Sequence, residues 1–358
     1  MIKIVIFALL LMLQASTTTA RAQWAAQSSG TSVRLRGVSA VTPLVAWASG
    51  DRGTYARTTD GGVTWKAGTV PDALELDFRD VDAFDADTAY LLSIGEGEKS
   101  RIYKTVDGGR HWQLQYKSGR KEAFFDSMAF WDRDHGIAVS DPVAGRFLII
   151  STSDGGRTWR EMPTEGMPEA LPGEGAFAAS GTCIAVEGKR NVWFGTGGPN
   201  GARLFRSTDG GRNWTVTKTP VTGGKTAGIF SVAFWNARDG IVVGGDYTKE
   251  GEAKNNLAIT RDGGRTWSLI TGSTPGGYRS CVAFVPGLSS PILISVGPTG
   301  SDYSMDGGKS WTSLGAEGFH SASFSASGKG WAVGEGGRIA VYLKSPRRMM
   351  PSGLKKLF

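Results

Sequence analysis

The sequence predicts an all-β protein, a seven-bladed β-propeller, from three observations. An eight-residue pattern, [Ser/Thr]-x-Asp-Gly-Gly-x-x-Trp, occurs six times at intervals of 44 to 55 residues. Short runs rich in β-branched and aromatic residues fill the intervals, and 52 of the 358 residues are glycine. Repeats of this length cannot bury both faces of their own small sheet, and a radial arrangement of such sheets is a propeller.

The six copies of the pattern, which we call box turns, have the chemistry of a tight hairpin. The carboxylate can accept backbone N–H groups while the paired glycines adopt positive φ, and the Trp begins the returning strand. A calcium loop would need several oxygen ligands at alternate positions, whereas each turn offers one carboxylate. We therefore expect a structural role for the box residues Asp60, Trp65, Asp107, Trp112, Asp154, Trp159, Asp209, Trp214, Asp262, Trp267, Asp306 and Trp311.

Each interval is expected to hold three strands before its box turn and one after it, which makes a four-stranded antiparallel blade. Three further runs, HSASFSA, GWAVGE and RIAVYL, follow the sixth box turn without a seventh one. Near the other end of the chain, Trp24 in QWAAQ has the place of a box tryptophan. We therefore expect the strand at Trp24 to complete the last blade and close the ring within a single domain over residues 23–343.

The two ends of the chain carry its excess positive charge. Seven of the 40 Lys and Arg lie in residues 1–22 and 344–358, which contain no acid, so 33 basic residues balance 33 acidic ones between them. Residues 1–22 combine Lys3, a ten-residue apolar run and a small-x-small cleavage pattern ending at Ala22. This pattern predicts a signal peptide, and hence a periplasmic or secreted protein with no transmembrane segment once processed. The basic end is expected to be a flexible tail, and no nucleic-acid partner is predicted.

The box turns resemble the Asp-box, or bacterial neuraminidase, repeat. More of the chain resembles the photosystem II stability/assembly factor family of exported seven-bladed propellers, through the box turns, VAFWNARDGIVVGG (residues 232–245) and GWAVGEGGRI (residues 330–339). The resemblance implies a non-catalytic platform that binds another exported or membrane-associated protein, and we expect the protein to be a monomer. Because sialidases carry the same boxes, a sialidase-like glycoside hydrolase acting on an anionic sugar is the alternative.

The face opposite the box turns is where we expect a binding site. Inner strands begin there, and alignment of the repeats places Arg36, Arg79, Asp126, Thr182 and His320 at equivalent positions, with Arg279 at the start of a further inner strand. Asp246 and Tyr247 fall in a long loop, residues 244–256, on the same face. The predicted binding residues are Arg36, Arg79, Asp80, Asp126, Ser127, Asp246, Tyr247, Arg279 and His320.

No catalytic residue, cofactor or metal site is predicted. The chain has no Arg-Ile-Pro motif of the sialidase type and no His/Cys cluster with metal-ligand spacing, and its Gly-rich stretch, residues 195–201, leads into a strand. A Ser–His–Asp arrangement of Ser321, His320 and Asp126 is conceivable. Cys183 and Cys281 are expected on inner strands of two non-adjacent blades around an open channel, too far apart for a disulfide.

Overall fold

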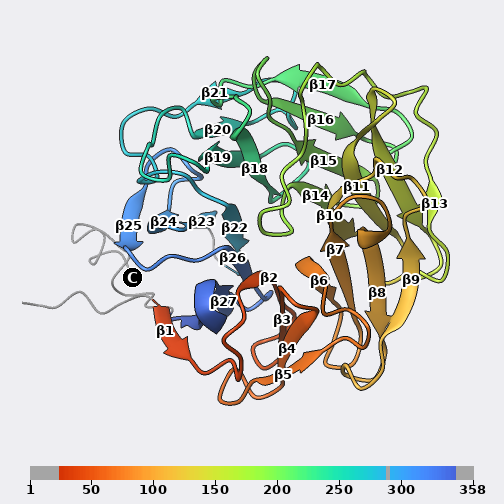
Figure 1. Ribbon diagram of the computed structural model, residues 1–358. Coiled ribbons are helices and arrows are strands. Elements are labelled where there is room, and N and C mark those ends of the chain that lie inside the picture. Colours follow the sequence, from red (N-terminus) through yellow and green to blue (C-terminus); the bar gives the residue numbers. More distant parts are fainter. Residues whose placement is uncertain (1–23, 288–290, 344–358) are drawn as a thin grey trace, which may run out of the picture.

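Seven four-stranded sheets surround a central axis in the computed structural model, which describes residues 24–287 and 291–343. Figure 1 shows the ring, with the first strand of each blade nearest the axis. The predicted seven-bladed propeller is confirmed. The expected signal peptide and basic tail lie outside the described residues. Within the described part, no helix is long and apolar enough to span a membrane.

Blades one to four follow the predicted order of strands. Blade one comprises β2 (Leu35–Ala40), β3 (Ala46–Gly50), β4 (Thr54–Thr58) and β5 (Lys66–Thr69). Blade two comprises β6 (Asp77–Ala83), β7 (Ala89–Ile94), β8 (Arg101–Thr105) and β9 (Gln113–Lys117), with the 3-10 turn η1 (Gly97–Lys99) before β8. Blades three and four comprise β10 (Phe125–Phe130), β11 (Gly136–Val143), β12 (Arg146–Thr152), β13 (Arg160–Glu161), β14 (Ile184–Glu187), β15 (Asn191–Gly195), β16 (Arg203–Ser207) and β17 (Thr215–Lys218).

The last three blades continue this order until the N-terminal strand completes the ring. Blades five and six comprise β18 (Ala227–Phe234), β19 (Gly240–Asp246), β20 (Leu257–Thr260), β21 (Ser268–Leu269), β22 (Cys281–Val285), β23 (Ile292–Gly297), β24 (Gly300–Ser304) and β25 (Thr312–Gly315). Blade seven comprises β26 (Ser321–Phe324), β27 (Gly330–Val333), β28 (Ile339–Tyr342) and β1 (Trp24–Gln27), with the turn η2 (Glu335–Gly337) before β28.

The ring closes where β1 pairs antiparallel with β28, with Trp24 opposite Tyr342. Trp24 is 5% exposed and its ring lies 5.3 Å from both Phe319 and Tyr342. Its indole N–H donates to Ser301 Oγ in blade six at 3.0 Å. The predicted closure by the N-terminal strand is thus confirmed, and Trp24 joins blade seven to blade six.

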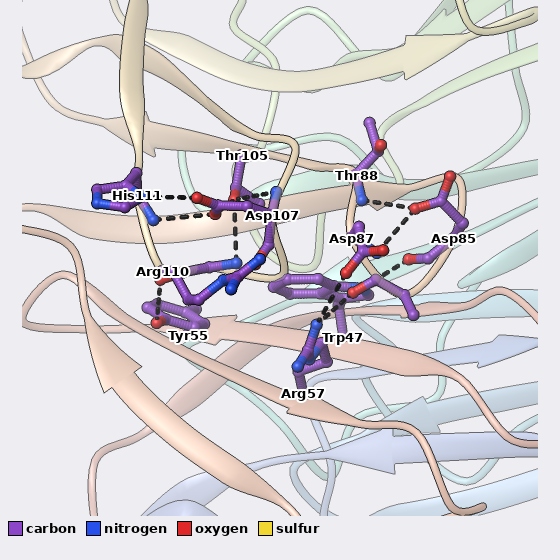
Figure 2. Close-up of polar contacts among 12 residues, drawn as sticks. Trp47, Tyr55, Arg57, Asp85, Asp87, Thr88, Thr105, Asp107, Arg110 and His111 are labelled. Carbon is purple, nitrogen blue, oxygen red and sulfur yellow. Dashed lines mark hydrogen bonds and ion pairs between the residues drawn. The ribbon is translucent and has the colours of Figure 1, made fainter.

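Hydrogen bonds within each box turn hold the turn together. In the second turn the Thr105 hydroxyl donates to Asp107 and accepts from the Gly109 N–H, while Asp107 also accepts from the backbone and the ring of His111 (Figure 2). In all six turns the residue four positions after the Asp donates from its side chain to the same carboxylate. Both glycines of the second turn have positive φ, 77° and 86°, which other residues adopt only with strain.

The core consists of apolar seams between neighbouring blades. At the first seam, Trp112 of the second box turn lies edge-on to Trp47 of blade one, with ring centroids 6.0 Å apart. Polar contacts cross the same seam, where Trp47 donates to the Asp85 carbonyl and Arg57 pairs with Asp87 (Figure 2). Burial of apolar surface at every seam makes each blade depend on its neighbours.

Candidate functional site

The central channel is not open, because one segment of the chain crosses it. This plug segment, residues 175–182, precedes β14 and reaches towards the axis, as Figure 1 shows for the yellow-green chain between β13 and β14. The predicted inner strand is present as β14 (Ile184–Glu187), whereas the expected open channel is wrong, because the plug segment crosses the axis. Regular pairing with β15 begins at Ile184, and several residues of the plug segment bond to other blades.

Hydrogen bonds tie the plug segment to the six other blades. Blades one, two and three are reached by bonds from Arg36 to the Ala179 carbonyl (2.7 Å), from Arg79 to the Ala178 carbonyl (2.8 Å) and from the Ala176 N–H to Asp141 (2.9 Å). Blades five, six and seven are reached by bonds from Thr182 to Ser231 (2.7 Å), from Ser180 to the Ser280 carbonyl (2.7 Å) and from Ser321 to the Ser180 carbonyl (3.0 Å).

Above the plug segment, on the face opposite the box turns, lies a cavity of about 550 Å³, which we call the upper cavity. It brings together five of the nine predicted binding residues, namely Arg36, Arg79, Asp126, Tyr247 and His320. Charged side chains and aromatic rings both line its walls. A cavity of this size holds a few residues of an extended peptide or a sugar unit.

Arginines form one part of the wall. Arg36 is buried, and burial, followed by repulsion from Arg79 and Arg34, lowers its pKa to about 10. Arg79 lies beside Asp77, with 2.7 Å between Nε and Oδ2, while Arg34 makes a two-pronged contact with Asp51. Backbone carbonyls of the plug segment hold Arg36 and Arg79 in place, so neither side chain has to reorganise to meet an anion.

Carboxyl groups from blade three form another part of the wall. Asp126, at the start of β10, is 1% exposed, and Asp141 lies on the neighbouring strand β11. Burial, and then the nearby charge of Asp141, raise the pKa of Asp126 well above its usual range. Burial also raises the pKa of Asp141 to about 6. Both carboxyl groups therefore bind a proton more readily than an ordinary aspartate does.

Stacked rings line the cavity beside these charges. Phe177 of the plug segment stacks on Phe230 of blade five at 4.0 Å, and Tyr278 lies edge-on to Phe230 at 4.8 Å. Tyr247 lies 6.1 Å from Phe230 and is 47% exposed. The rings offer an apolar surface to the non-polar part of a ligand.

His320 does not form part of a catalytic triad. Its Nε2 lies 2.8 Å from Glu335 Oε1, and the Ser321 hydroxyl donates to the Ser180 carbonyl. Burial, and then repulsion from Arg36, lower the pKa of His320 to about 4, although Glu335 opposes the shift. Near neutral pH the imidazole is therefore uncharged. The conceivable Ser–His–Asp arrangement is not formed.

Four predicted binding residues do not line the upper cavity. Arg279 is bound within its own blade to Asp302, with 2.7 Å between Nη2 and Oδ2, and both side chains are buried. Asp246 accepts hydrogen bonds from Thr226, directly before β18, and from Thr248 in its own loop. Arg279 was expected at the binding site from a strand start and Asp246 from a loop, but local partners hold both side chains away from the cavity.

Asp80 and Ser127 lie beneath the plug segment. Ser127 donates to Asp80 at 2.8 Å, and the Met128 N–H donates to the same carboxylate oxygen at 2.7 Å. Asp80 lines a lower cavity of about 330 Å³, together with Asp82 and the underside of the plug segment. The plug segment thus separates two cavities along the axis.

Sequence reasoning missed several residues of the upper cavity. Phe177, Asp141, Glu250, Tyr278 and Glu335 all line it. One signal was present in the sequence, since more than twenty residues separate Trp159 from the next inner strand, a longer link than at most other blades. The position of such a link depends on its contacts with distant blades, and the sequence of the link itself does not predict these contacts.

The two cysteines are free and buried. Cys281 lies 3.5 Å from the Ala322 carbonyl in the next blade. The predicted pair of unlinked thiols is therefore confirmed. In residues 24–287 and 291–343, no three His, Cys, Asp or Glu side chains gather closely enough to hold a metal ion.

These features define a seven-bladed propeller with a plugged channel and a charged cavity on one face. Its fold is similar to that of YCF48 bound to a D1 peptide, with a TM-score of 0.65 and 16% identity over 90% of this chain and 97% of that one. YCF48 from Cyanidioschyzon merolae is similar as well, with a TM-score of 0.63 and 20% identity over 89% of this chain and 98% of that one. The WD40 propeller domain of Doa1 has a TM-score of 0.58 and 12% identity over 91% of this chain and 99% of that one.

The expected likeness to photosystem II assembly-factor propellers is therefore confirmed for the fold. No protein-family model matches the chain, and no curated protein matches its sequence. The structural neighbours differ from this chain at four of every five positions or more, so they describe the scaffold, and function has to be argued from the site.

Proposed function

We propose that the protein is an exported, non-catalytic platform that binds a segment of another protein in the upper cavity. The observation that carries the proposal is the way Arg36 and Arg79 are held. Each donates to a backbone carbonyl of the plug segment, so their positions are set before a ligand arrives. Rigid guanidinium groups beside aromatic rings are suited to an acidic side chain or chain terminus of a peptide.

Three features support a peptide as the ligand. The cavity volume of about 550 Å³ suits a short extended segment. The stacked pair Phe177 and Phe230 can pack against side-chain carbons of the ligand. A neighbour of the same fold, YCF48, is seen with a peptide bound.

The test is capture of partner proteins by the tagged mature protein from an extract of exported proteins. We expect Arg36→Gln/Arg79→Gln to lose most of the captured protein. Because glutamine is shorter than arginine and does not reach the plug carbonyls, circular dichroism is used to show that the variant is folded. Arg146→Ala, which removes a partly exposed arginine paired with Glu169 outside the cavity, is the matched control. Capture should weaken gradually with added salt, as expected for contacts between charges. Equal capture by the double variant and the control would contradict the proposal.

The alternative, a sialidase-like glycosidase, is favoured by one observation, the two carboxyl groups of Asp126 and Asp141 in one cavity. Paired carboxyl groups serve glycoside hydrolysis as acid and as base or nucleophile. A panel of aryl sialosides and other aryl glycosides separates the two functions. The platform predicts no turnover, whereas turnover that disappears in Asp126→Asn or Tyr247→Phe would establish the enzyme.

A further inference from the structure

Charges in the upper cavity are only partly balanced by the protein itself. Arg34 is paired with Asp51, and Arg79 is paired with Asp77. In the described part of the chain, Arg36 has no carboxylate within ion-pair distance, and neither Asp126 nor Asp141 has a cation there. The wall that contains Arg36 therefore lacks a negatively charged partner, and the wall that contains Asp126 and Asp141 lacks a positively charged one.

Two buried atoms of these walls have no hydrogen-bond partner within the described residues. They are Nε of Arg36, a side chain 8% exposed, and Oδ2 of Asp126, a residue 1% exposed. A polar atom left without a partner inside a protein lowers stability, and proteins rarely keep one without a reason. Both atoms belong to residues that line the same cavity, and a small shift of either side chain would bring its atom to the cavity surface.

We propose that Asp126 and Asp141 form a subsite for the ammonium or guanidinium group of a Lys or Arg side chain in the bound segment. This inference rests on the proposed function, since it assigns a second recognition element to the same peptide. The segment would carry an acidic group for Arg36 and a basic one for the two aspartates. A segment with both charges supplies a partner for Arg36 and for the two aspartates, whereas a purely acidic segment leaves the aspartates without a partner.

The surroundings of the two aspartates suit a long basic side chain. Phe124, directly before β10, and Phe177 of the plug segment line the cavity with them. Lys and Arg can lay their methylene stems against such rings while the charged end meets a carboxylate. Asp141 is already oriented, because one of its oxygens accepts the Ala176 N–H at 2.9 Å.

Proton release is a second expected property of this subsite. The charged or titratable groups around Asp126 are Asp141 on β11, Arg79 on β6, and Cys183 and Asp80 beneath the plug segment. Burial and Asp141 favour the protonated form of Asp126, whereas a bound cation would favour its ionised form. Peptide binding should therefore be accompanied by proton release that depends on this carboxyl pair.

The experiment uses a library of hexapeptides. Each peptide contains one Glu and one Lys, the library includes every combination of positions for these two residues, and the remaining positions are alanine or tyrosine. Each peptide is matched by one with norleucine in place of Lys. Affinity and proton release are measured by calorimetry with the mature protein, in two buffers of different ionisation enthalpy. Variants are Asp126→Asn, which keeps the shape of the side chain, and the control Glu98→Gln, an exposed acid outside the cavity that pairs with Lys117.

We expect some Glu-Lys peptides to bind, and norleucine in place of Lys to weaken them by about tenfold or more, as for loss of a charged hydrogen bond. In Asp126→Asn both the preference for Lys and the proton release should disappear, while Glu98→Gln keeps both. If norleucine peptides bind equally well, or if Asp126→Asn keeps the preference, the cation subsite is wrong and the platform still stands. If the wild-type protein binds no peptide of the library, the proposed function fails together with the subsite.

Discussion

Three aspartates around the axis carry pKa values well above that of an ordinary carboxyl group. Burial raises the pKa of Asp80 to about 8, of Asp82 to about 7 and of Asp141 to about 6. In an unfolded chain the pKa of Asp is about 3.9. In the folded protein these three groups therefore hold protons that the unfolded chain has released, so their own contribution to stability is greatest at low pH and is lost as pH rises through this range.

Asp80 offers the clearest test of this dependence. At about pH 5 it is protonated in the folded state, and Asp80→Asn should change stability little because an amide can replace a neutral carboxyl group that accepts from Ser127 and Met128. Above about pH 8 the wild-type protein must bury a charge, so Asp80→Asn should be more stable by about 1–3 kcal/mol. Urea unfolding at several pH values measures the difference. A constant difference at all pH values would show that Asp80 does not hold the extra proton.

At the scale of a structural element, the plug segment depends on Gly181. This residue has φ of 72°, and an added Cβ would lie 2.3 Å from Asp80 Oδ1 and 3.1 Å from Asp80 Cα. Gly181→Ala should therefore lower the free energy of unfolding by about 1–3 kcal/mol and detach the segment from the channel. Hydrogen exchange measured by mass spectrometry should show faster exchange over residues 175–182, with the blades unchanged.

Gly145→Ala is the matched control, because Gly145 also has positive φ, 83°, but an added Cβ there would meet nothing within 4 Å. It carries the same kind of backbone strain without a collision. We expect it to leave exchange in the plug segment unchanged. Faster exchange over residues 175–182 in both variants would attribute the effect to general destabilisation and not to this contact.

The plug segment also marks the limit of prediction from the sequence. Arg36 and Arg79 could be placed near the cavity because each occupies an equivalent position in its repeat. Thr182 was placed on an inner strand by the same alignment, but bonds to distant blades, such as that with Ser231, determine its position. Arg279 has an inner-strand start as well, yet the buried partner Asp302 lies on another strand of its blade and turns it away from the cavity. Repeat position predicts the backbone, whereas the direction of a side chain depends on partners that repeats do not specify.

At the scale of the whole molecule, closure of the ring depends on β1. The fold could be predicted because six box turns and a tryptophan at the other end of the chain are all sequence features. Trp24→Ala should lower the free energy of unfolding by about 3–5 kcal/mol, as for other large aromatic residues removed from a core. Leu44→Ala, which truncates a residue 56% exposed, should change little and is the control. Urea unfolding with unchanged midpoints for both variants would show that the ring does not need this contact.

The position of the closing pair has a mechanical consequence. Trp24 and Tyr342 are opposite each other at the same end of the antiparallel seam, and the chain leaves the blade on both sides of this pair. Tension applied between the two ends would therefore separate β1 from β28 one residue pair at a time, starting at Trp24 and ending at Gln27. A strand loaded along its length would instead resist with all its bonds at once. The pairing that closes the ring is thus weaker against a pull between the two strand ends at this pair than against a load along the strands.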